Sequence, residues 1–236
     1  MLENIKSFTI LFCGLLCVTS TFGQQAYSAS PETGIMNFVS SSSTIESDKT
    51  KGSPYLNDEF VHGEVIVNNK VELIGKMRYN AFRNEIEILD NKTSTSYYSL
   101  LKRAYIGVEI GNRSYNIYTY KDSDESVRTS YFTNLNEGKL KLLFKPEAIL
   151  KQARRPSTSY EKYVPPTYVW NNSYYILRGS KDNEVNHAFK VRLTKKNILE
   201  LTGEKEREMK AYVKENKLNL RQEKDVVSFL NYYNTL

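Results

Sequence analysis

Short runs in which apolar and polar residues alternate fill the middle of the chain. Val65 and Val67 begin the series. The same period of two recurs at residues 86–88, 106–110, 115–120, 140–144, 174–178 and 188–193. Period-2 runs with short connections indicate an antiparallel sheet that buries one face.

The turns between these runs carry residues that tolerate a positive φ. Asn68-Asn69 and Gly111-Asn112 are such sequences. About ten strands are too many for one flat open sheet, which would curl or split. We therefore expect a mainly β fold over residues 54–193, as a curled meander, a barrel-like closure or two packed sheets.

The last forty or so residues change to a helical period. Thr194 is a candidate N-cap for a short helix that Gly203 ends, and a second helix is expected over 204–217. Asn219 is a candidate cap for a third, with Gln222 at its third position. That helix carries an apolar stripe of Val226, Phe229, Leu230 and Tyr233. Residues 194–236 are thus expected as two to three helices packed on the β domain.

The first 23 residues have the layout of a secretory signal peptide. Lys6 precedes an apolar run over 8–18, and small residues precede a possible cut before Gln24. The run is shorter than the roughly 20 residues of a membrane span, although an uncleaved anchor is the alternative. We expect an exported protein, periplasmic, associated with the outer membrane or extracellular, with no transmembrane span after cleavage.

Both cysteines, Cys13 and Cys17, lie inside this segment. Neither follows a small residue, which argues against a lipid-modified cysteine. Cleavage would leave a chain without disulfides, thiolate nucleophiles or cysteine metal ligands.

Residues 24–53 are predicted as a disordered linker. The part from Ser40 to Ser53 is polar and almost free of large apolar residues. Such a segment buries too little surface to offset the entropy of ordering it. It is interpreted as a spacer, with a tether to a partner as the alternative.

Charge narrows the choice of partners. The net charge is +6 with 25% charged residues, a mild excess that suits anionic envelope polymers and is also a common solubility feature. Nucleic-acid binding requires clustered basic residues, and the best cluster, 151–155, is short. No nucleic-acid partner is expected.

The sequence contains no recognisable catalytic, cofactor or metal motif. His62 and His187 are the only histidines, too few for a transition-metal site without cysteine. There is no G-x-S-x-G nucleophile motif and no Gly-rich phosphate loop. Glu85, Glu87 and Glu109 lie opposite the apolar positions, so we expect them on a solvated sheet face. No catalytic residue, metal or cofactor is predicted, and an enzyme is disfavoured.

The stretch "SYEKYVPPTYVW" (159–170) lies in a long segment that breaks the strand rhythm. Long loops in compact domains are often functional, and Pro156, Pro165 and Pro166 favour an extended path. The candidate residues for binding a ligand or partner are Arg154, Arg155, Tyr160, Tyr163, Tyr168 and Trp170. Their rings and guanidinium groups suit stacking and anionic contacts. The alternative is that the rings fold back and cover the open end of the sheet.

Three segments resemble a widespread set of exported proteins of Bacteroidota. They are "RYNAFRNEIEI" (78–88), "YFTNLNEGKLKLLFK" (131–145) and the lysine-rich tail that ends in "YYN" (195–234). The resemblance covers about residues 53–236 and implies an envelope location and a β-rich region followed by helices. It assigns no activity and no site residue.

The sequence is best interpreted as an exported, non-enzymatic envelope protein that binds a partner protein or an envelope polymer. A glycan hydrolase with an unrecognised carboxylate pair is one alternative, which a cleft with two facing buried acids would favour. An accessory subunit of an outer-membrane assembly is another, which an exposed stripe at Val226, Phe229 and Tyr233 would favour. A flat aromatic patch at Tyr160 to Trp170 would favour the first interpretation.

Overall fold

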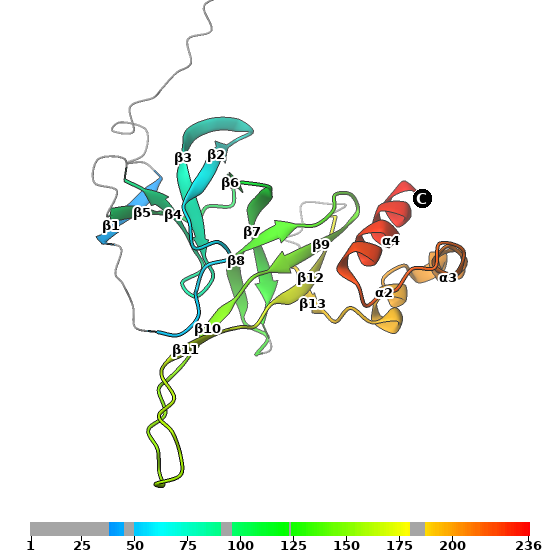
Figure 1. Cartoon of the computed structure of the whole chain (residues 1–236). Helices are drawn as coiled ribbons and strands as arrows, with labels where there is room; N and C mark the ends of the chain where they lie inside the picture. The colour runs from blue at the N-terminus through cyan, green and yellow to red at the C-terminus, as the bar shows by residue number, and fades with distance from the viewer. Residues whose placement is uncertain (1–37, 45–49, 91–95, 123, 180–186) are drawn as a thin grey trace, which may run out of the picture.

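The protein is described by a computed structural model that covers residues 38–44, 50–90, 96–122, 124–179 and 187–236. It is mainly β, with antiparallel pairing throughout the main sheet and helices at the C-terminus, as the alternation predicts (Figure 1). The predicted signal peptide lies outside the described residues. Within the described part, no helix has the length and apolar character of a membrane span.

Eleven strands form the main sheet, in the order β1-β5-β4-β3-β2-β6-β7-β8-β9-β12-β13. Their bounds are β1 Val39–Thr44, β2 Val61–Val67, β3 Lys70–Asn80, β4 Glu85–Leu89, β5 Ser96–Leu100, β6 Ile106–Ile110, β7 Arg113–Lys121, β8 Val127–Asn134, β9 Leu140–Lys145, β12 Ser173–Arg178 and β13 Phe189–Val191. The predicted turns are present: Asn68 and Asn69 have φ of 50° and 63°, and Gly111 has φ of 59°. These left-handed residues let the strands reverse within two residues.

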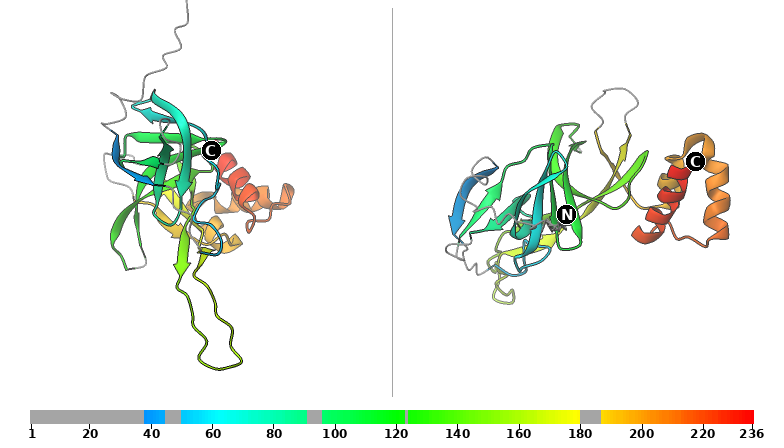
Figure 2. Two further views of the ribbon diagram at one scale, coloured as in Figure 1. Left: turned by 60° about the vertical axis from the view of Figure 1, so that its left-hand side comes forward. Right: turned by 90° about the horizontal axis from the view of Figure 1, so that it is seen from above.

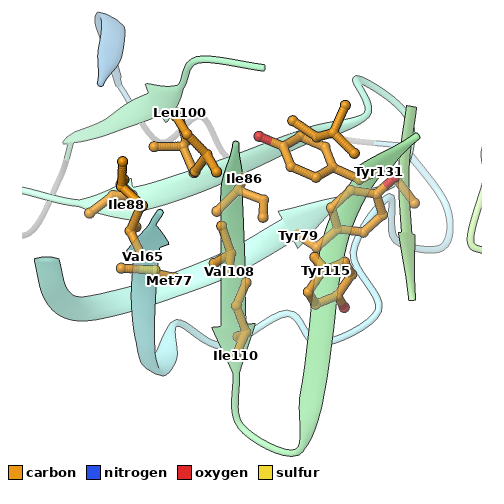
Figure 3. Packing of buried hydrophobic residues seen from close by; sticks show 14 of the residues in the cluster. Val65, Met77, Tyr79, Ile86, Ile88, Leu100, Val108, Ile110, Tyr115 and Tyr131 are labelled. Atoms are coloured by element: carbon orange, nitrogen blue, oxygen red, sulfur yellow. The ribbon is translucent and has the colours of Figure 1, made fainter. Parts of the chain in front are cut away.

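The first eight strands curl around one apolar core. Val65, Met77, Ile86 and Val108 are almost fully buried in it, although they come from four different strands. Figure 3 shows their side chains converging with three tyrosine rings. A sheet this long curls to bury its face, but the strand order of the described residues is open, with no closed barrel.

The end of this curl is covered by a separate ribbon, β10 (Ala148–Lys151) and β11 (Thr167–Trp170). Ala148 and Tyr168 pack on the core. The segment from Lys51 joins the ribbon to the sheet, because the Lys51 amide donates to the Pro166 carbonyl at 2.9 Å and the Ala81 amide donates to the Pro54 carbonyl at 2.8 Å.

The other end of the sheet carries the helices α2 (Lys195–Glu200), α3 (Glu206–Glu215) and α4 (Glu223–Thr235). Leu142 of β9 and Ile176 of β12 share a buried cluster with Ile198, Met209 and Phe229 of the helices. Asn234 fastens α4 to the sheet, accepting from the Leu140 amide at 2.9 Å. Thr194 caps α2, as predicted, by accepting from the Asn197 amide.

Two local predictions differ from the structure. The third helix begins at Glu223 with Gln222 as its N-cap residue, whereas Asn219 accepts from the Arg221 amide in the preceding turn. Within the predicted disordered linker, residues 39–44 form β1 and pair with β5. Backbone hydrogen bonds to β5 hold this segment in a strand, which its polar composition alone did not indicate.

Glu87 is the clearest correction to the expected sheet surface. Its exposed fraction is 0%, while Glu109 is exposed and Glu85 is half-buried. Arg78 Nε donates to Glu87 Oε2 at 2.7 Å, and Asn80 Nδ2 donates to Oε1 at 2.8 Å. Residues 53–60 fold across this face, so Glu87 is a buried, paired charge rather than a solvated one.

Candidate functional site

A two-stranded arm projects from the body of the molecule. It comprises residues 151–167, which continue the β10–β11 ribbon into solvent (Figures 1 and 2). The Arg154 and Val164 backbones exchange hydrogen bonds of 2.9 and 3.0 Å halfway along it. At the tip, Glu161 accepts from the amide and the hydroxyl of Ser157, each at 2.9 Å. These bonds and the three prolines give the arm an ordered, extended path.

The arm exposes its side chains almost completely. Every residue from 151 to 164 is exposed, and Tyr160 has an exposed fraction of 98%. Four of the arm's five charged residues are basic: Lys151, Arg154, Arg155 and Lys162. The one acid, Glu161, is held in the tip turn, and its hydrogen bonds to Ser157 lower its pKa. The arm therefore presents net positive charge together with aromatic rings.

The six predicted binding residues fall into two groups. Arg154, Arg155, Tyr160 and Tyr163 lie on the arm and are exposed. Tyr168 lies at the base, where its ring meets Phe82 at a centroid distance of 5.4 Å and packs on the core. Trp170 pairs with Ala148, also at the base, and keeps 42% of its surface exposed. The rings are therefore spread along the arm and its base and do not form one flat patch.

Beside the base of the arm lies a pocket of about 410 Å³ that the sequence did not indicate. Its lining includes Phe82 and Ile149 at the rim and Tyr120, Lys145 and Glu147 inside. Lys145 Nζ donates to Tyr120 Oη at 3.0 Å and lies 3.1 Å from Glu147 Oε1. These residues come from β7, from β9 and from the turn before β10, so only the fold brings them together.

The lysine in this pocket is buried and charged. Burial disfavours its ammonium form, but the hydrogen bonds with Tyr120 and Glu147 outweigh that effect and raise the pKa of Lys145. Glu147 is positioned by Asn171, whose Nδ2 donates to Oε2 at 2.8 Å. The stretch "FKPEA" (144–148) places Lys145 at the end of β9 and Glu147 in the turn that follows, but it contains no sign of the distant Tyr120.

The described residues show neither the pair of facing buried acids that would favour a glycan hydrolase nor the exposed helical stripe that would favour an accessory subunit. Among the described residues, Glu87 is the one fully buried acid, and Arg78 neutralises it. Val226 and Phe229 have exposed fractions of 0% and Tyr233 is half-buried against the same cluster, so the helical stripe packs against the protein. His187 Nδ1 lies 3.0 Å from Thr119 Oγ1, and the described part of the chain contains no cluster of His, Cys, Asp and Glu that could hold a metal.

Comparison with known proteins gives no further assignment. No family model matches the chain, and no curated protein or solved structure matches it significantly.

Proposed function

We propose that this is an exported, non-enzymatic protein that binds an anionic polysaccharide of the cell envelope through its arm. The observation that carries the proposal is the ordered arm itself, which is exposed from residue 151 to residue 164 and basic. An exposed element contributes little apolar burial to folding. Its exposed rings and cations are therefore better explained by a ligand than by stability.

The chemistry of the arm matches a polymer with sugar rings and negative groups. Tyr160 and Tyr163 present exposed faces that can stack on sugar rings. Arg154 and Arg155 supply guanidinium groups that bind carboxylates and phosphates with two parallel hydrogen bonds. The spacing of these groups along an extended ribbon suits an extended chain more than a compact ligand.

A protein partner is the second candidate. Tyr and Arg are also the residues that dominate protein interfaces, and a ribbon can insert into a groove. The positive charge of the arm favours the polymer, because exposed charges of one sign attract a polyanion over long range.

The test is a titration of the purified protein with polygalacturonate and with lipopolysaccharide, using dextran as the neutral control. Calorimetry measures affinity, and the single tryptophan, Trp170, reports by fluorescence from the base of the arm. We expect binding to at least one anionic polymer and none to dextran. The affinity should fall as salt rises from 50 to 500 mM, because salt screens exposed charges.

Matched variants locate the contact. Arg154→Ala/Arg155→Ala should weaken binding by about tenfold, equivalent to about 1.4 kcal/mol. Arg207→Ala/Lys214→Ala removes the same charge from the exposed face of α3 and should leave the affinity unchanged. Equal losses in the two variants would mean that net charge, not the arm, drives binding, and the proposal would fail.

A further inference from the structure

The pocket at the base of the arm has a charge balance that differs from that of the arm. Three charged side chains line it: Arg128, Lys145 and Glu147. Lys145 and Glu147 pair with each other, and Arg128 lies 3.0 Å from Asp122 and 2.9 Å from Asp124. Each cation thus already has an anionic partner, so the pocket offers no surplus positive charge to an anion.

The pocket nevertheless keeps polar capacity that these pairs do not use. An ammonium group has three N–H donors, and Lys145 uses two, on Tyr120 and Glu147. Tyr120 accepts from Lys145, and its own O–H donates to no other residue in the described part of the chain. Each oxygen of Glu147 accepts one hydrogen bond, from Lys145 or Asn171, and can accept another.

These polar groups lie inside a pocket whose rim is partly apolar. Tyr120 has an exposed fraction of 5%, and its ring packs edge-on against Phe132 and Tyr175. Phe82 and Ile149 form the rim and expose nearly half their surface. A volume of about 410 Å³ lies at the small end of the range for ligand pockets, roughly 300 to 1,000 Å³.

We infer that this pocket binds one neutral sugar unit. Neighbouring hydroxyls of a hexose combine donor and acceptor roles, which match the carboxylate of Glu147, the ammonium of Lys145 and the hydroxyl of Tyr120. The apolar face of the sugar ring would lie against the side chain of Phe82 or Ile149. The inference rests on the proposed polysaccharide function for its biological sense, and it adds that the polymer contains neutral hexoses besides its anionic groups.

The experiment measures monosaccharide binding to the purified protein by ligand-detected NMR and calorimetry. The probes are glucose, galactose, mannose and N-acetylglucosamine, with galacturonate as the charged comparison. We expect at least one neutral sugar to bind in the millimolar range and galacturonate to bind no more tightly. Absence of binding by all four neutral sugars, or clearly tighter binding of galacturonate, overturns the inference.

Variants then assign the binding to the pocket. Tyr120→Phe keeps the packed ring and removes only the hydroxyl, and Glu147→Gln keeps the size of the side chain. Each should weaken sugar binding about tenfold, a change that corresponds to about 1.4 kcal/mol. The matched control is Tyr118→Phe, which removes a hydroxyl two residues away on β7 that lines a different pocket. Unchanged binding in Tyr120→Phe and Glu147→Gln would overturn the assignment.

The two proposals fail separately. Arg154→Ala/Arg155→Ala should weaken polymer binding and leave monosaccharide binding intact. Polymer binding that depends on the arm, without any monosaccharide binding, refutes the pocket and leaves the arm. Monosaccharide binding that depends on Tyr120, with polymer affinity indifferent to the arm, refutes the arm and leaves the pocket.

Discussion

Arginine occurs in two contrasting environments in this protein. On β3, Arg78 is buried, donates to Glu87 and to Tyr55, and lies with its guanidinium carbon 3.7 Å from the Tyr55 ring centroid and 4.2 Å from that of Phe60. On the arm, Arg154 and Arg155 are exposed. The same side chain holds a segment onto the sheet in one place and is available to a ligand in the other. Burial and partners, rather than residue type, separate structural from functional charge.

The largest effect should come from breaking the buried pair. Arg78→Ala leaves Glu87 buried without its counter-ion, which typically costs about 3–5 kcal/mol in unfolding free energy. Denaturant unfolding measures the loss. Arg154→Ala is the control and should change the stability by less than about 0.5 kcal/mol. Similar losses in both variants would remove the distinction between the two environments.

The next effect concerns pH. Burial raises the pKa of Tyr115 to about 12, and burial also raises the pKa of Tyr79 and Tyr131. An unfolded tyrosine ionises near pH 10, so the unfolded state loses protons first. The contribution of these three tyrosines to stability should be constant below about pH 10 and then fall by up to about 1.4 kcal/mol per pH unit for each tyrosine.

Unfolding curves between pH 8 and 12 measure this fall. Tyr115→Phe removes one ionising group and should give a shallower slope. A stability that stays flat up to pH 12 would show that these hydroxyls are not buried.

A third effect separates binding from folding on the arm. Tyr160→Ala removes a ring that is 98% exposed, so unfolding free energy should stay within about 0.5 kcal/mol of the parent. Stacking on a sugar should make the same change cost about 1 kcal/mol in polymer affinity. A loss of stability with unchanged affinity would assign the ring a structural role.

The smallest effect concerns the buried hydroxyl of Tyr131. Tyr131 lies in the core, and its Oη finds no hydrogen-bond partner among the described residues. Tyr131→Phe removes this group and should leave stability equal or higher by about 1 kcal/mol. The matched control is Tyr79→Phe, which deletes a hydroxyl bonded to Asn84 at 3.0 Å and should destabilise. Destabilisation by Tyr131→Phe would imply a partner for its hydroxyl.

Much of the fold could be predicted because it rests on local periodicity. The alternation at Val65 and Val67 indicated a buried strand face, and the Asn68-Asn69 turn and the Thr194 cap are determined by neighbouring residues. Predictions failed where distant segments meet. The burial of Glu87 depends on residues 53–60 crossing the sheet. The Asn219 prediction failed for a local reason, because its side chain accepts from the Arg221 amide in the turn before α4.

The candidate site divides in the same way. The arm could be singled out from sequence because prolines and aromatic residues interrupt the strand rhythm over 151–170. The pocket could not, since Tyr120 meets Lys145 and Glu147 only after β7 and β9 have both paired with β8. Contacts between residues that are distant in the sequence produce no periodic pattern from which they could be predicted.

Removing the arm tests the central claim most directly. Joining Lys151 to Thr167 through Asn-Gly replaces residues 152–166 with a two-residue hairpin turn and keeps the last β10–β11 pair. Thermal unfolding and polygalacturonate or lipopolysaccharide binding are then measured on the same preparation. We predict an unfolding midpoint within a few degrees of the parent and loss of polymer binding. Retained binding, or a protein that no longer folds, would contradict the account of the arm as a binding element separate from the folded core.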